Sequence, residues 1–415
     1  MTGGEIGMYA ITFLAVYVQI FLLVTFFERR KELNKFHGSP VPKLDHYPRV
    51  AVIMPCWNEE KTVHGTIASL LALDYPKDKL EIIIIDDGST DTTWQEILQH
   101  KGNPQIKMFQ KENGGKHTAV NFGIDHTDAD LIGCLDADSF VEPDALKRMV
   151  HAFNTHPDIM ATAPSMIIHK PKNIVQFAQR VEYNMSTYNK KMLSFMNAIH
   201  VTPGPFSIFR KEVFQIIGKF KKAHGTEDQE IAYRMQEHHM RIYHCHDAIV
   251  YTSSPDSVKK LYKQRLRWIY GFIQNTIDYR RLIFRSKYGN FSFYTLPAGI
   301  ISICAVVYLS FALAYNFILL VIKKITEWSI VGWNPAFSGF HFDPFFINTR
   351  TIVFVEIIIY SLIVFAVIMG SRLTGQKNKL NWHIIPYVLM YSIISPFWLL
   401  KAVWNTLRGR QPAWR

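Results

Sequence analysis

The chain has 415 residues, of which 48% are hydrophobic, and a formal net charge of +12. This length exceeds that of a usual single domain, so we expect at least two structural units. A basic chain can bind nucleic acid, but no zinc-finger spacing is present. Nine Lys or Arg residues and one acid lie between Ser257 and Asn290, directly before an uncharged run. Such a block is typical of contact with anionic lipid headgroups, so nucleic acid is not an expected partner and membrane lipid is.

The four cysteines, at positions 56, 134, 245 and 304, form no CxxC pair. This usage suits a reducing cytosol and indicates neither a disulfide framework nor a zinc site.

An uncharged run of 20 residues, Met8–Phe27, stands near the N-terminus and is followed by a charged stretch that includes Arg29, Arg30 and Lys31. The run is long enough to span a bilayer. It has no basic segment before it and no small-residue cleavage site, so we interpret residues 1–31 as a retained transmembrane anchor. The positive-inside rule then places the following domain in the cytosol.

The middle of the chain alternates short apolar runs with amphipathic segments. Strands and helices joined by short connections are typical of an α/β domain with a mostly parallel sheet covered on both faces. The expected strands are Val50–Met54, Leu80–Ile85, Ile106–Phe109, a strand from Leu131, Ile159–Ile168 and Ser207–Phe209. The expected helices begin near Val63, Thr92, Gly115, Glu142, Ile174, Lys211 and Gln229.

Residues 131–139 read LIGCLDADS, so Asp136 and Asp138 follow directly on a buried strand. In open α/β sheets, ligands bind at the carboxyl ends of the strands. Two carboxylates one residue apart on a turn can coordinate one Mg²⁺ or Mn²⁺ ion that also binds a substrate diphosphate. The alternative is that this turn only caps the helix that follows.

Two further expected strands end in acidic side chains, at Glu59 and at Asp86 and Asp87. A third runs into Gly114, Gly115 and Lys116, without the spacing of a phosphate-binding loop. Each acid alone could be a helix cap or a solvated turn. Together they suit a nucleotide whose base and ribose contact Glu59 and Asp87, with its diphosphate on the metal.

Thr226, Glu227 and Asp228 open the expected helix that runs to Glu237. Acids in a first helical turn are favoured by the helix dipole, which is a structural reason for Asp228. The functional alternative is a carboxylate that faces the metal edge and accepts a proton.

Residues 264–268 read QRLRW, and on a helix Gln264, Arg267 and Trp268 share one face. Arg beside Trp can bind a diphosphate while the indole stacks under a sugar ring. A basic amphipathic helix on the membrane, with Trp268 at the interface, is the alternative, and both can hold together.

Three apolar segments follow, at Phe291–Ile322, Thr351–Gly370 and His383–Trp404. Glu356 lies inside the second and should face protein or a pore. A full crossing by the last segment would export Arg408, Arg410 and Arg415, against the positive-inside rule. A re-entrant or interfacial segment would keep them inside, and the residues leave this open.

These motifs together resemble those of the processive, membrane-embedded family-two glycosyltransferases, which include the cellulose, hyaluronan, chitooligosaccharide and poly-N-acetylglucosamine synthases. The family's DDG, DxD, TED and QxxRW motifs correspond to residues 86–88, 136–138, 226–228 and 264–268, in this order and between apolar segments. The resemblance implies a GT-A-type, Rossmann-like domain that uses a UDP-sugar and Mg²⁺ or Mn²⁺.

Carried over residue by residue, the resemblance implies that Asp228 is the general base of an inverting transfer. It also implies a catalytic or acceptor role for Glu227, Gln264, Arg267 and Trp268, donor contacts from Asp86, Asp87, Lys116, Asp136 and Arg265, and metal ligation by Asp136 and Asp138. Glu59 is expected to contact the donor because of its place at a strand end. The partners would be the UDP-sugar, a growing glycan or lipid acceptor, membrane lipids and an accessory export subunit.

The expected organisation is an anchor (1–31), a cytosolic GT-A domain (48–256), basic interfacial helices (257–290), a transmembrane region (291–404) and a basic tail (405–415). We expect a multi-pass protein of the cell membrane that elongates and exports a β-linked polysaccharide, with UDP-N-acetylglucosamine as the favoured donor. One alternative is the transfer of a single sugar to a membrane lipid, as ceramide glucosyltransferases do. Another is a transporter or scaffold whose cytosolic domain merely binds nucleotide.

Overall fold

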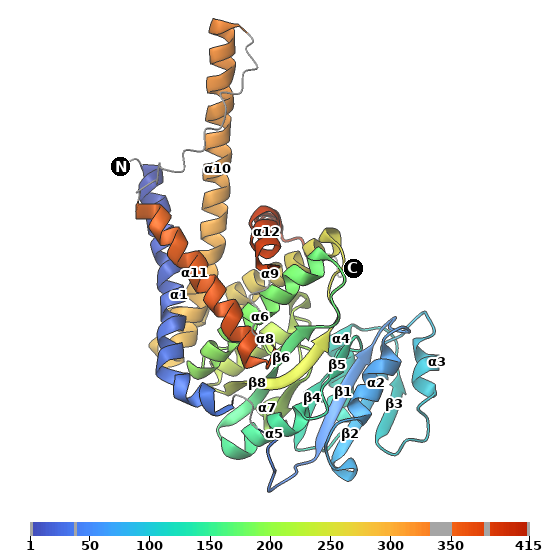
Figure 1. The fold of residues 1–415 in the computed structure, drawn as a ribbon. Coiled ribbons are helices and arrows are strands. Elements are labelled where there is room, and N and C mark those ends of the chain that lie inside the picture. The colour runs from blue at the N-terminus through green and yellow to red at the C-terminus, as the bar shows by residue number, and fades with distance from the viewer. Residues whose placement is uncertain (1–2, 37–39, 333–350, 377–381, 413–415) are drawn as a thin grey trace.

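The computed structural model describes residues 3–36, 40–332, 351–376 and 382–412. Arg350, Lys377, Lys379 and Arg415, which bear on the expected topology, lie outside these ranges, as do parts of the expected transmembrane region and tail. Within them, the chain forms one eight-stranded sheet with helices on both faces and a group of long apolar helices beside it (Figure 1).

The strand order is β3-β2-β1-β4-β7-β6-β8-β5. Strands β1 to β4 pair in parallel, as do β6 and β8, whereas β7 and β5 run antiparallel to their neighbours. The expected mostly parallel α/β sheet is therefore confirmed. The strands are β1 (Val50–Cys56), β2 (Leu80–Asp86), β3 (Ile106–Gln110), β4 (Leu131–Cys134), β5 (Ser139–Val141), β6 (Ile159–Ile168), β7 (Ser207–Arg210) and β8 (Arg241–Thr252).

Alternate residues of the central strands face opposite layers, because successive strand side chains point to opposite sides of a sheet. In β1, Val50, Val52 and Met54 pack in one core with α2 and α5, while Ala51 and Ile53 pack in the other with α4, α6 and α8. The helices of this domain are α2 (Val63–Leu71), α3 (Thr93–Leu98), α4 (Lys116–Asp125), α5 (Ala145–Thr155), α6 (Ile174–Phe195), α7 (Lys211–Ile217), α8 (Glu227–Glu237) and α9 (Val258–Asp278).

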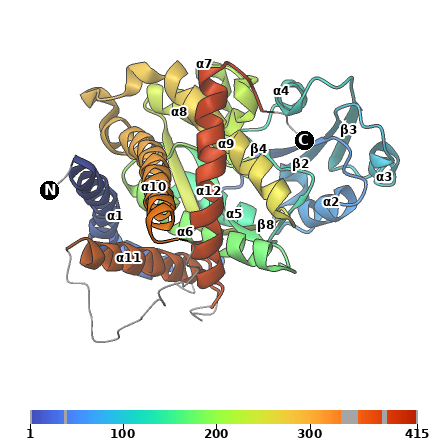
Figure 2. The same cartoon turned by 90° about the horizontal axis from the view of Figure 1, so that it is seen from above.

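Among the described residues, four helices are long and apolar enough to cross a membrane: α1 (Gly3–Phe36), α10 (Leu296–Val331), α11 (Thr351–Leu373) and α12 (Ile384–Leu407). The first three stand at one side of the sheet domain, and α1 packs against α10 and α11 (Figure 1). The fourth runs at a large angle to α10 and lies on α9 and α6 (Figure 2). Glu356 is exposed on the surface of α11 among the described residues, and the expectation that it faces protein or a pore stays a prediction.

Two strands differ from the sequence-based expectation. No strand was expected at β5 or β8, and β5 occupies the segment directly after Asp138, where a helix was expected to follow. Helix α5 begins only at Ala145, with Asp144 at its N-cap position. Asp136 and Asp138 therefore do not cap this helix, and the structural alternative for the DxD turn is wrong.

Candidate functional site

The expected acidic residues lie along one edge of the sheet, because β1, β2 and β4 run in parallel and end side by side. After β4 the chain turns through Asp136 and Asp138 into β5, and the amide of Ser139 donates to the carbonyl of Asp136 at 3.0 Å. Burial, Asp136 and Glu59 raise the pKa of the Asp138 carboxyl to about 6. The negative charges near Asp138 would therefore be stabilised by a bound cation.

Lys116 connects two parts of this edge. Its ammonium lies 2.5 Å from Asp136 Oδ1 and 3.8 Å from Glu227 Oε1. Although burial opposes the charged form, the negative charges around it, chiefly Asp136, hold the pKa of Lys116 above its usual value. A Cβ atom on Gly204 would lie 2.5 Å from this ammonium and 3.0 Å from Asp136 Oδ2, so a side chain at this position would displace Lys116 from its place beside Asp136.

Asp228 reaches the same region from α8. The helix begins after a turn in which Ala223 and His224 have φ values of 40° and 54°, a left-handed conformation that is costly for residues other than glycine. Burial and the neighbouring Glu227 raise the pKa of Asp228 to about 6, while Lys116 and Arg267 oppose the shift. Its side chain lines a cavity together with Lys116, Gly204 and Glu227.

Helix α9 holds this turn in place. Gly271 approaches α8 so closely that an added Cβ would lie 2.2 Å from Thr226 Oγ1, and Asn275 Nδ2 donates to the same oxygen at 3.0 Å. The guanidinium of Arg267 donates to the carbonyl of Gly225 at 3.2 Å. The TED and QxxRW segments are therefore directly in contact.

Arg265 is buried, and its guanidinium donates to Glu182 Oε2 of α6 at 2.5 Å. Its guanidinium carbon also lies 4.1 Å from the centroid of the Trp268 ring. From helical spacing, Gln264, Arg267 and Trp268 were expected on one face. In the structure Arg265 contacts both Gln264 and Trp268, while Arg267 contacts the turn before α8.

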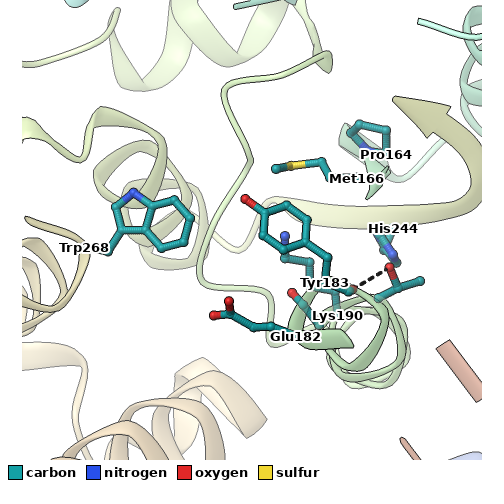
Figure 3. A pocket seen from close by; sticks show the side chains of 9 residues that line it. Pro164, Met166, Glu182, Tyr183, Lys190, His244 and Trp268 are labelled. Carbon is teal, nitrogen blue, oxygen red and sulfur yellow. Dashed lines mark hydrogen bonds between the residues drawn. The ribbon is translucent and has the colours of Figure 1, made fainter. Parts of the chain in front are cut away.

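Trp268 forms one wall of a second cavity, with an empty volume of about 420 Å³ (Figure 3). Glu182, Tyr183 and Lys190 of α6 line it from one side, and His244 of β8 from another. Burial lowers the pKa of Lys190 to about 8, against the influence of Asp228 and Glu182. The buried Nδ1 atom of His244 has no hydrogen-bond partner within the described part of the chain.

Sequence reasoning missed these four cavity residues. Helix α6 was expected, but nothing in its composition distinguished its cavity-facing side, and the strand that carries His244 was not expected at all. Charges of the acidic edge act on this second cavity, because Asp138 adds to the burial that raises the pKa of Tyr183 and Asp228 opposes the burial that lowers the pKa of Lys190.

The acidic side chains expected to contact the nucleotide accept hydrogen bonds from other groups of the chain. Asp87 is buried and accepts from the amides of Gly114 at 3.1 Å and Gly115 at 2.9 Å. Asp86 accepts from the amide of Ser89 and from Gln110. Glu59 accepts from Thr62 Oγ1 at 2.8 Å. Their expected donor contacts stay predictions, and the structure adds that Asp87 positions the Gly114–Gly115 turn next to Lys116.

In the described ranges, no group of three or more His, Cys, Asp or Glu side chains could hold a metal ion. Asp136 and Asp138 offer two hard oxygen ligands. Such a pair suits Mg²⁺ or a similar ion whose other ligands are water and substrate oxygens.

The sheet, its acidic edge and the adjoining apolar helices define a membrane-associated transferase of the GT-A type. The fold is shared with the mannosyltransferase of Pyrobaculum calidifontis, solved in complex with GDP-mannose and Mn²⁺, at a TM-score of 0.59 and 18% identity over 96% of this chain and 99% of that one.

Residues 51–218 match the model of glycosyl transferase family 2, so the chain carries a domain of this type and is a glycosyltransferase enzyme. It is similar to the poly-beta-1,6-N-acetyl-D-glucosamine synthase of Staphylococcus epidermidis, with 28% identity over 96% of this chain and 93% of that protein. The Staphylococcus aureus protein of the same name is 31% identical over 62% of this chain and 63% of its own length.

Proposed function

We propose that the protein is an inverting glycosyltransferase that elongates a β-linked polysaccharide from a UDP-sugar, with UDP-N-acetylglucosamine as the favoured donor. The observation that carries this proposal is the convergence of Lys116, Asp136 and Asp228 beside the Trp268 cavity, next to the apolar helices. The similarity to two poly-N-acetylglucosamine synthases supports a polysaccharide product and this donor.

In this proposal Asp136 and Asp138 hold a divalent cation. When bound, Mg²⁺ or Mn²⁺ would neutralise the charge that develops on the departing diphosphate. The raised pKa of Asp138 supports such a site, because a cation relieves the mutual repulsion of the nearby carboxylates. Lys116 would bind the donor phosphates from the other side of Asp136.

Asp228 is the proposed general base. A carboxylate with a pKa of about 6 is a stronger base than an ordinary aspartate and is still ionised at neutral pH. It would remove the proton from the acceptor hydroxyl as the oxygen attacks the anomeric carbon, with inversion. Glu227 raises the basicity of Asp228 through its charge.

The Trp268 cavity would hold the terminal sugar of the acceptor. The indole offers a stacking surface, and the ammonium of Lys190 offers polar contacts to hydroxyl or amide groups.

Helices α1, α10 and α11 would place the enzyme in the cell membrane as a multi-pass protein, with the GT-A domain in the cytosol, where nucleotide sugars are found. The adjoining helices would let synthesis and export form one process, and an accessory export subunit could take part.

Incubation of the purified protein with each common UDP-sugar and Mg²⁺, followed by sizing of the product, tests this proposal. We expect a polymer from UDP-N-acetylglucosamine that a β-hexosaminidase degrades. A product with one sugar on a membrane lipid would instead support the ceramide glucosyltransferase-like alternative. A protein that binds UDP but transfers no sugar from any donor would overturn the proposal.

A further inference from the structure

Helix α12 exposes one side along its whole length. Its exposed positions form one stripe along its whole length, at intervals of three or four residues: Ile385, Leu389, Ser392, Ile393, Phe397, Lys401, Trp404 and Leu407. In contrast, nearly every position of the outer half of α10, from Leu313 to Ile330, is exposed. Helix α1 exposes a similar stripe, at residues 6, 10, 13, 17, 20, 24 and 27, so a stripe shows only that the other side of the helix packs on protein. The contacts of α12 decide whether it crosses the membrane or lies on its surface.

The opposite face of α12 contacts the catalytic part of the chain along its length. Near its start, Tyr387 approaches the sulfur of Met185, and at its middle Tyr391 donates to Glu182 Oε2 at 2.5 Å. Near its end, Gln274 of α9 donates to Thr406 at 3.4 Å.

These contacts determine the depth of α12 relative to α9 and α6. Tyr387 and Thr406 are 19 residues apart, which corresponds to about 28 Å along a helix. This is nearly the thickness of the hydrocarbon core, about 30 Å. If α12 crossed the membrane, the helices that it contacts would have to cross as well.

Helix α9 cannot cross, because five basic residues lie within its first ten positions: Lys259, Lys260, Lys263, Arg265 and Arg267. Helix α12 must therefore lie at the level of α9. The figures agree with this position. In Figure 1, α10 stands upright and α12 is seen nearly end-on, whereas in Figure 2 α12 is seen at full length and α10 nearly end-on. The two helices are therefore nearly perpendicular.

We propose that α12 is an interfacial helix that binds the lipid surface of the leaflet facing the catalytic domain, and that the C-terminus stays on the side of this domain. The apolar stripe would enter the acyl region, and Trp404 at the stripe's end would lie at headgroup level. Arg408 and Arg410 would meet anionic headgroups, which satisfies the positive-inside rule that a crossing would violate.

The chain direction agrees with this arrangement. The C-terminal end of α11 lies against α6, where Gln376 contacts Arg180 and Asn184. Helix α12 therefore starts on the side of the catalytic domain. The inference does not depend on the donor, the acceptor or the reaction.

Depth measurement with spin labels tests the proposal in the full-length protein in lipid vesicles that contain phosphatidylglycerol. A Cys304→Ser background removes the exposed thiol of α10, and the other three cysteines are buried. Labels are placed singly at Ile385→Cys, Leu389→Cys, Ile393→Cys and Phe397→Cys, with Leu313→Cys, Phe317→Cys and Leu320→Cys of α10 as the matched spanning control. Retained transferase activity reports that each variant is folded.

We expect the α12 labels to lie at one common shallow depth, with oxygen more accessible than a water-soluble nickel complex, while the α10 labels differ in depth by about 1.5 Å per residue. A depth that rises to a maximum within α12 would overturn the proposal. Equal exposure of all four α12 labels to the nickel complex would also overturn it, because the stripe would then face water.

The side of the C-terminus is a second readout. Gln411→Cys should react with a membrane-impermeant maleimide from the same side as Asp74→Cys, an exposed position in the catalytic domain. Reaction of these two variants from opposite sides would mean that α12 crosses the membrane.

Discussion

Arg265 lies over the ring of Trp268, with its guanidinium carbon 4.1 Å from the ring centroid. The same guanidinium donates to Glu182, which also accepts from Tyr391 of α12. One carboxylate therefore ties the proposed acceptor platform to α6 and to α12. The position of the indole depends on residues that are more than 80 positions away in the sequence.

Glu182→Gln should weaken this arrangement without removing any group from the cavity. An amide cannot balance the buried charge of Arg265, so the guanidinium should shift and Trp268 with it. We expect KM for the acceptor to rise about tenfold or more while the affinity for UDP, measured by calorimetry, stays unchanged. Tyr391→Phe removes one hydrogen bond to Glu182 and should raise the acceptor KM by a smaller factor. An unchanged acceptor KM in both variants would contradict the role of this network.

Asp228→Asn removes the proposed base and keeps the shape of the side chain. Loss of general-base catalysis costs roughly 10²–10⁴-fold in rate. We expect kcat in a labelled-donor assay to fall by about 10²-fold or more, while UDP still binds. The matched control is Asp74→Asn, an exposed carboxylate paired with Lys147, which should transfer sugar normally. Equal turnover by Asp228→Asn and the parent would show that another group accepts the proton.

The pH profile should have an acid limb and an alkaline limb with different origins. Because burial and Glu227 raise the pKa of Asp228 to about 6, the base is protonated and kcat falls as the pH drops below about 6. Because burial lowers the pKa of Lys190 to about 8, its ammonium loses a proton above about pH 8, and KM for the acceptor should rise there. Initial rates at saturating metal, between pH 5 and pH 9.5, separate the two limbs.

Lys190→Arg is the control for the alkaline limb. A guanidinium stays charged throughout this range, so the rise of KM above pH 8 should disappear while the acid limb of kcat remains. Lys190→Met should instead give the high acceptor KM at every pH. An alkaline limb that is identical in the parent and Lys190→Arg would assign it to another group.

Gly271→Ala should disturb the base through a single added carbon. The new Cβ would lie 2.2 Å from Thr226 Oγ1, so α8 and Asp228 must move away from α9. A displacement of about 1 Å at a catalytic group can cost on the order of 10²-fold, and we expect a loss of kcat of that order. Gly133→Ala, where the nearest atom is 3.4 Å from the new Cβ, is the matched control and should keep most of the activity.

Removal of divalent metal should stop transfer reversibly. A chelator is expected to abolish product formation, and Mg²⁺ or Mn²⁺ should restore it. Asp138→Asn should raise the metal concentration needed for half-maximal rate by roughly 10–100-fold, as the loss of a charged oxygen ligand weakens the site. Full activity after exhaustive chelation would argue against a metal at Asp136 and Asp138.

The sequence by itself determined the parts of this protein that depend on local pattern. Short apolar runs such as Leu131–Cys134, followed by acidic residues, predicted parallel strands whose ends meet at one edge of the sheet. This prediction was possible because a parallel strand that is buried on both faces is almost continuously apolar in sequence. Residues 8–27 and 291–322 predicted long apolar helices, because the thickness of the bilayer sets their length. The motif residues were found for the same reason: their spacing is visible in the chain.

Only the tertiary structure decided the features that depend on contacts between distant residues. Strand β8 was missed because its polar residues, among them His244 and His246, are buried by neighbours that no local pattern reveals. Glu182 and Lys190 line the cavity because α6 lies opposite Trp268, 86 and 78 positions later. The apolarity of α12 allowed both a crossing and an interfacial position, and only its contacts with Met185, Glu182 and Gln274 distinguish them, because depth is a property of what a helix packs against.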